Sequence, residues 1–149
     1  MSIIKQALTA RTALNVTGLA TLASATYVAS DIYTANTNQP LDVAIEIDAA
    51  TTNTPSGNKR LMVFLQESLD GTNFRSGPTS GTSATDEHNL LSLGVIPMNS
   101  VTTTQKATFS VAQTLGYVPY AFRVVIKNDL GVALTSAAVY TSEVTTTVV

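Results

Sequence analysis

The fold is decided by the stretch YAFRVVIKNDLGVAL, residues 120–134. Side chains alternate between the two faces of an extended strand, so Phe122, Val124 and Ile126 share one face. The other face carries Ala121, Arg123, Val125 and Lys127. The segment NDLG at 128–131 follows, and Asn, Asp and Gly are residues that tolerate a bent backbone. We therefore predict a β-hairpin in which a second extended run, 132–139, returns beside the first.

Other stretches of the chain are also typical of strands. Leu41 to Ala49 has the alternation of a strand, and Leu61 to Leu69 is apolar enough to predict a central strand that is buried on much of both faces. Shorter extended runs occupy residues 25–33, 90–97, 102–112 and 140–149. Turn-rich segments separate most of these runs, and the longest is a Ser-, Gly- and Thr-rich loop from Ser76 to Asn89.

This pattern predicts an all-β protein with seven to nine strands and no internal helix. Sheets that are apolar on one face must cover that face, so we expect an antiparallel β-sandwich of the jelly-roll or Greek-key type. The sandwich is expected to be a single domain over residues 25–149, preceded by an N-terminal arm or irregular segment over residues 1–24. Within that segment, residues 1–11 fit either one or two helical turns or an arm on another subunit.

Composition limits the partners of the chain. Only 12% of the 149 residues are charged, against about 25% in an average soluble domain, and Thr is the commonest residue. A weakly charged surface favours association with other proteins. A net charge of −2 with scattered basic residues argues against nucleic-acid binding, and no apolar run approaches the ~20 residues of a membrane span. The absence of cysteine excludes disulfides and thiolate metal sites.

Three polar features are candidates for chemistry. His88 is the only histidine and has no second metal ligand or nucleophile nearby in sequence, so we interpret it as a solvated loop residue. The carboxylates of Asp42, Glu46 and Asp48 share one strand face and could bind Ca²⁺ or cleave glycosides, but we interpret them as the solvated outer face of a strand whose other face is buried. The segment 70–73 (DGTN) offers oxygen ligands for Ca²⁺, yet it is short and reads as a turn.

A sugar-binding platform of aromatic rings is a further candidate, although we expect these rings to pack in the core or at strand edges. The rings in question are Tyr27, Tyr33, Tyr117, Tyr120 and Tyr140. The sequence contains no phosphate-binding glycine loop and no nucleophile elbow. We therefore expect a non-enzymatic protein with no cofactor and no bound metal.

Two stretches resemble segments of small structural proteins from the virions of tailed bacteriophages. They are QESLDGTNFRSG, residues 66–77, and YVPYAFRVVIKNDLGVAL, residues 117–134, and the similarity extends over about residues 41–140. The family includes β-sandwich proteins that decorate, or cement, the capsid. The resemblance implies a protein made in the cytoplasm of the bacterial host and bound as a homo-oligomer, often a trimer, to the major capsid protein on the outside of the virion.

The apolar ends of the chain are the expected contact residues. A weakly charged chain with β-prone termini is typical of a protein that packs against copies of itself and a scaffold. We predict contacts with the capsid or with other subunits at Ile3, Ile4, Leu8, Val144, Val148 and Val149. A tail, neck or fibre component of the virion and a carbohydrate-binding β-sandwich module remain the alternative functions.

Overall fold

Alternating apolar side chains form the inner faces of two sheets that pack against each other. Every second side chain points between the sheets on β5 (Asp42–Ala50), β6 (Arg60–Ser68) and β10 (Ala121–Asp129). These inward side chains are fully buried: Val43, Ile45, Ile47, Leu61, Val63, Leu65, Phe122, Val124 and Ile126. The alternation predicted for the strand after Leu41 is therefore confirmed from Val43 onward, whereas Leu41 itself is exposed.

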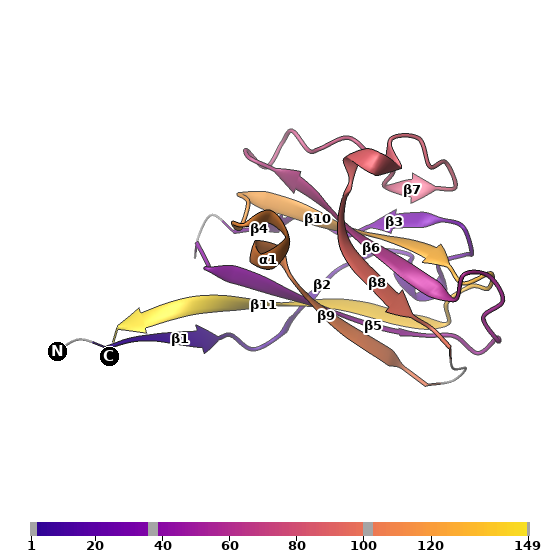
Figure 1. Cartoon of the computed structure of the whole chain (residues 1–149), viewed down its shortest axis with the longest axis horizontal. Coiled ribbons are helices and arrows are strands. Elements are labelled where there is room, and N and C mark those ends of the chain that lie inside the picture. The colour runs from indigo at the N-terminus through magenta and orange to yellow at the C-terminus, as the bar shows by residue number, and fades with distance from the viewer. Residues whose placement is uncertain (1–2, 36–38, 100–102, 149) are drawn as a thin grey trace.

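The computed structural model describes residues 3–35, 39–99 and 103–148, and it confirms an all-β sandwich of two antiparallel sheets (Figure 1). The first sheet has the order β1 (Ile4–Leu8), β11 (Ser136–Val148), β5 and β9 (Gln105–Ser110), with β2 (Thr12–Leu14) also paired to β11. The second has the order β7 (Ser80–Gly81), β3 (Tyr27–Ala29), β10, β6 and β8 (Leu91–Pro97), with β4 (Tyr33–Thr34) also paired to β10.

Strand β6 has the central position that its sequence predicts. It lies between β10 and β8, and its outward residue Phe64 is buried too. The described residues nevertheless form eleven strands, more than the expected seven to nine. The difference comes from strands of two or three residues, which are too short to show a period in the sequence.

The predicted hairpin at 120–134 is wrong. β10 and β11 lie in different sheets, and the residues between them carry the chain from one sheet to the other. The cause is Asn128, whose buried side chain accepts a hydrogen bond from the Leu130 amide at 2.9 Å and donates to the carbonyls of Val132 and Leu22, both at 2.8 Å. Leu130 then enters the core instead of capping an exposed turn.

The expectation of no internal helix is also wrong. A short α-helix, α1 (Val111–Leu115), follows β9 directly, and two 3₁₀ turns lie at Leu19–Thr21 and Glu87–Asn89. The Ser110 hydroxyl accepts from the Gln113 amide at 3.0 Å and caps the start of α1, while Gly116 ends it with a φ of 82°. None of the helices in the described part of the chain has the length and hydrophobicity needed to cross a bilayer.

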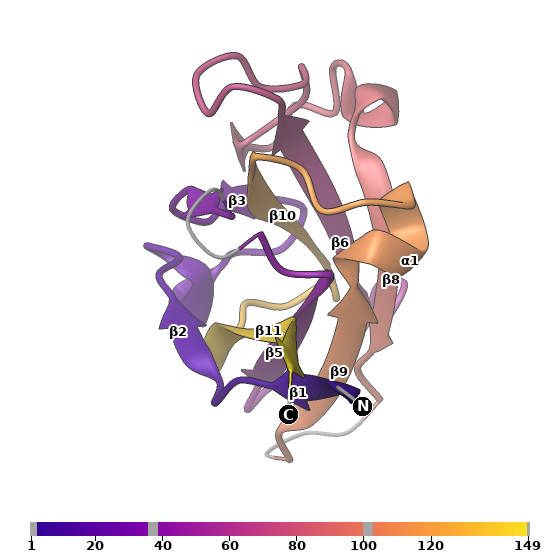
Figure 2. The same ribbon diagram turned by 90° about the vertical axis from the view of Figure 1, so that its left-hand side faces the viewer.

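The N-terminal residues join the first sheet. β1 is a strand, so the helical alternative for residues 1–11 is wrong. β2 pairs with β11, and Leu19 and Leu22 are buried in the main core, so the core already receives side chains from before residue 25. The start of β1 and the end of β11 extend together beyond the rest of the sandwich and lie side by side there, with Ile4 opposite Val148 (Figures 1 and 2).

Candidate interaction surface

Among the described residues, several exposed apolar side chains lie on a two-stranded ribbon. It consists of β1 and residues 144–148 of β11, paired antiparallel from Ile4 opposite Val148 to Leu8 opposite Val144. β5 pairs with β11 only as far as Val144. Beyond that point the described part of the chain supplies no second neighbour for β11, so this end of the ribbon projects as two strands alone (Figure 1).

One face of the ribbon carries a stripe of apolar side chains. Residues directly opposite each other in an antiparallel pair share a face, and so do alternate residues along each strand. The face therefore holds the apolar pairs Ile4–Val148 and Leu8–Val144, with the polar pair Gln6–Thr146 between them. We call the four apolar residues the apolar stripe. Ile4, Leu8 and Val148 are 70%, 65% and 72% exposed. Because Val139 of β11 points into the core, the even-numbered residues of that strand, and with them the stripe, lie on the outer face of the first sheet.

Four of the six residues predicted as contacts thus meet on one surface. Ile3 precedes β1 and is 57% exposed, but the period of two places it with Lys5 on the opposite face. Val149 lies outside the described residues. A two-stranded ribbon alone is only marginally stable in water, and exposed apolar side chains gathered on one face are characteristic of a contact site.

The base of the ribbon is fixed to the body by hydrogen bonds. The Thr9 amide donates to the Glu143 carbonyl at 2.9 Å, and the Glu143 amide donates to the Thr9 hydroxyl at 2.8 Å. The Tyr33 hydroxyl of β4 donates to the Glu143 carboxylate at 2.5 Å. Arg11 forms an ion pair with Glu46 and stacks over the ring of Tyr140. The direction in which the ribbon leaves the sandwich is therefore set at its base.

Tyr33 gives this base a dependence on pH. Burial raises the pKa of Tyr33 above its ordinary value, and the hydrogen bond to Glu143 and the charge of that carboxylate raise it further. The folded protein therefore holds the Tyr33 proton more tightly than the unfolded chain does. The contribution of this group to the free energy of unfolding is complete below pH ~10 and is lost as pH rises above that value.

Replacing Tyr33 with Phe is expected to lower the free energy of unfolding by about 1–2 kcal/mol at pH 7, because the hydrogen bond to Glu143 is lost. The wild-type protein should then lose stability between pH 9 and 11 more steeply than this variant. Urea denaturation of both proteins across that range measures the difference. Parallel pH profiles would contradict the role given to Tyr33.

The acidic residues of β5 are used within the fold. Asp42 accepts hydrogen bonds from the Ser110 hydroxyl at 2.6 Å and the Ala112 amide at 2.8 Å, which ties β5 to the start of α1. Asp48 pairs with Lys106 at 2.6 Å and lies 3.8 Å from Arg11. These residues lie on an outer face, as expected, and each has a cationic or hydrogen-bonding partner. Over the described ranges, no group of three or more His, Cys, Asp or Glu residues is arranged to hold a metal ion.

The segment 70–73 is a turn built around one carboxylate. Asp70 accepts hydrogen bonds from the amides of Asn73 at 2.7 Å and Thr72 at 2.8 Å and from the Asn73 side chain at 2.7 Å. Hydrogen bonds from the backbone of Asn73 and Thr72 hold the pKa of Asp70 well below its usual range. Because these bonds occupy both carboxylate oxygens, the turn explains the sequence DGTN without a cation.

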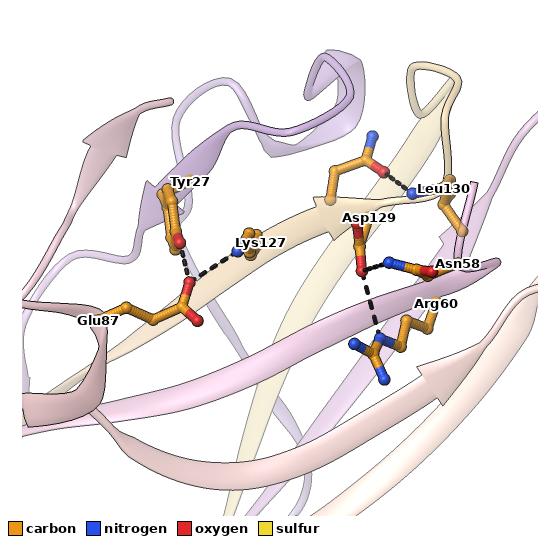
Figure 3. A network of polar contacts seen from close by, with 8 residues as sticks. Tyr27, Asn58, Arg60, Glu87, Lys127, Asp129 and Leu130 are labelled. Atoms are coloured by element: carbon orange, nitrogen blue, oxygen red, sulfur yellow. Dashed lines mark hydrogen bonds and ion pairs between the residues drawn. The ribbon is translucent and has the colours of Figure 1, made fainter. Parts of the chain in front are cut away.

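His88 is exposed, and its neighbour Glu87 has the structural role. The Glu87 carboxylate accepts hydrogen bonds from the Tyr27 hydroxyl and from Lys127, the latter at 2.7 Å (Figure 3). The Lys127 ammonium also lies 5.0 Å from the centre of the Tyr27 ring. These contacts fasten the end of the 76–89 loop over a small second cluster of buried side chains, formed by Tyr27, Phe64, Leu90 and Val125. Sequence reasoning singled out His88 in this loop and missed Glu87.

The tyrosines are dispersed over the molecule. Tyr27 is buried on the outer side of the second sheet, Tyr33 stacks on Phe122 with ring centres 4.7 Å apart, and Tyr140 lies beneath Arg11. Tyr117 and Tyr120 are exposed, and Tyr120 lines a hollow of about 470 Å³. The five rings do not form one flat platform.

Comparisons with known proteins leave the chain without an assigned family. No family model matches the sequence, and no curated protein matches it. A solved structure of Bacillus endospore appendages, described as a novel family of disulfide-linked pili, is 14% identical over 96% of this chain and 85% of that one. Its TM-score of 0.31 is too low to bear on the fold or the function of this protein.

Proposed function

We propose that this chain is a non-enzymatic structural protein of a bacteriophage virion that decorates, or cements, the capsid by binding the outer surface of the major capsid protein shell. The observation that carries the proposal is the apolar stripe, which a projecting ribbon presents away from the body. The resemblance of residues 66–77 and 117–134 to phage virion proteins is the reason for proposing the major capsid protein as the partner. The structural roles of Asp42, Asp70 and Glu87 support a non-enzymatic function.

A stripe of this size suits binding through several copies at once. Full burial of one Val, Leu or Ile side chain contributes about 1.5–3 kcal/mol, and association must first offset the loss of rotational and translational freedom. One stripe therefore binds weakly. A homo-oligomer such as the trimer implied by the resemblance would place several stripes on one shell, so that each later contact forms within the same complex.

Replacing Ile4 and Leu8 together with Glu is expected to weaken binding to undecorated capsids by at least about tenfold, because two charges would have to be buried in the contact. Co-sedimentation of the protein with purified capsids measures this affinity. The fold should be unaffected, since both side chains are exposed and outside the core.

A matched control changes the other face of the same strand. The pair Lys5→Gln and Ala7→Glu alters the net charge by the same amount, and it leaves the apolar stripe intact. Capsid binding of this control should remain close to that of the wild type. Equal binding by the stripe variant and the wild type would contradict the proposal, and binding to isolated tails in place of capsids would favour another virion component.

A further inference from the structure

We infer that the outer edge of β1 is a pairing surface for β1 of a second copy of this chain, in an antiparallel arrangement with a twofold axis at Gln6. The inference goes beyond the proposed function, because it concerns a contact between two copies and requires no shell. It follows from the direction of the backbone groups in β1, from the order of its side chains and from the position of the strand.

The backbone groups of β1 alternate between its partner and solvent. The Thr9 amide donates to Glu143, so the main-chain groups of Thr9 point toward β11. In an antiparallel pair the direction reverses at each residue. Lys5 and Ala7 therefore also point toward β11, and the remaining residues Ile4, Gln6 and Leu8 direct their N–H and C=O groups to the open edge. β1 is the terminal strand of its sheet, so within the described structure this edge is unpaired.

The sequence of β1, IKQAL, is complementary to itself about its middle residue. With the twofold axis at Gln6, Ile4 lies opposite Leu8 of the second copy, and each Gln6 lies opposite its equivalent. These are the residues whose backbone groups point outward, so opposite residues can exchange both hydrogen bonds. An axis at any other residue of β1 leaves part of the strand unpaired.

Charge and side-chain placement agree with this register. Lys5, the single charged residue of β1, lies opposite Ala7 of the second copy, so no like charges face each other. Ile4 and Leu8 lie on one face, and their pairing joins the two apolar stripes into one surface. Natural edge strands are usually protected by proline, bulges or several charges, and β1 contains no proline, no bulge and one lysine.

The position of β1 leaves room for the second body. The strand lies outside the sandwich and runs toward it (Figure 1). An antiparallel neighbour runs away from the first body, so the two bodies lie at opposite ends of the joined strands. Stable interfaces bury about 1,200–2,000 Å², and pairing of five residues buries less, so the contact should be weak and dependent on concentration. In a closed trimer, neighbouring subunits meet through two different surface patches. A twofold contact joins identical patches, so pairing of β1 with β1 would link one trimer to another.

The first test replaces Gln6 with proline. The N–H of Gln6 points to the open edge. Proline at this position therefore removes a hydrogen-bond donor to the second copy but leaves the hydrogen bonds between β1 and β11 in place. Light scattering coupled to size exclusion, from ten to several hundred micromolar protein, should show the mass of the wild type doubling while Gln6→Pro stays at the smaller mass. Gln6→Ala retains the N–H and should double like the wild type. Doubling of Gln6→Pro, or no doubling of the wild type, would overturn the inference.

The second test uses the absence of cysteine from the chain. In the proposed register the Cα atoms of the two Gln6 residues are about 5.5 Å apart, which suits a disulfide. Gln6→Cys should therefore form a covalent dimer on mild oxidation. Ile4→Cys should not, since its equivalent is about 14 Å away along the strand, but a mixture of Ile4→Cys with Leu8→Cys should cross-link. Equal cross-linking of Ile4→Cys alone would overturn the register.

Discussion

Replacing Asn128 with Asp is expected to lower the free energy of unfolding by about 3 kcal/mol or more at pH 7. The Asn128 amide is fully buried and donates to the carbonyls of Leu22 and Val132. In the variant an oxygen faces these carbonyls in place of the donor, and a buried acceptor or charge without a partner costs about 1–3 kcal/mol or more. The crossing from β10 to β11 then loses the contacts that set its path.

Urea denaturation checks this prediction, with Asn58→Ala as the control. Asn58 is exposed and its side chain donates to Asp129 at 2.7 Å, so its loss should change the free energy of unfolding by at most about 0.5 kcal/mol (Figure 3). Burial raises the pKa of the introduced Asp, so the deficit should grow as pH rises from 4 to 7. A deficit as small as that of the control would contradict the buried role of Asn128.

The same residue shows where sequence reasoning reached its limit. The inner faces of β5, β6 and β10 were predictable because alternation is a local property of each strand. Whether residues 128–131 reverse the chain or pass it to the other sheet depends on a distant partner. The Leu22 carbonyl that Asn128 meets lies 106 residues earlier in the chain. The sequence correctly predicted that the chain bends at residues 128–131. Which sheet the chain enters after the bend could not be predicted from these residues alone.

The termini show a similar limit. Ile4 and Leu8 are four residues apart, a spacing that puts two side chains on one face of a helix and equally on one face of a strand. Their exposure on a ribbon follows from pairing with residues 144 and 148, at the opposite end of the chain. The sequence therefore indicated apolar contact candidates at both ends of the chain. That four of them share one face follows only from the register in which β1 pairs with β11. α1 was missed because five residues show no helical period.

Phe122→Ala is expected to lower the free energy of unfolding by about 3–5 kcal/mol and also to loosen the base of the ribbon. Phe122 is fully buried between the sheets, so truncation leaves a cavity. Its ring stacks on Tyr33, whose hydroxyl reaches Glu143 at 2.5 Å, and Glu143 in turn bonds to Thr9. Once the ring of Tyr33 loses this support, the hydrogen bonds that fix the ribbon should open more often.

Leu61→Ala separates the two effects. Leu61 is equally buried, but it lies opposite Asn128, six residues along β6 from the Glu67 that pairs with Phe122. Its truncation should lower the free energy of unfolding by about 2–5 kcal/mol without faster hydrogen exchange at the amides of Thr9 and Glu143. Phe122→Ala should accelerate exchange at both amides under native conditions. If both variants left the Thr9 and Glu143 amides equally protected, the ribbon would be held independently of the core. Its direction would then be set by β-pairing and Arg11 alone.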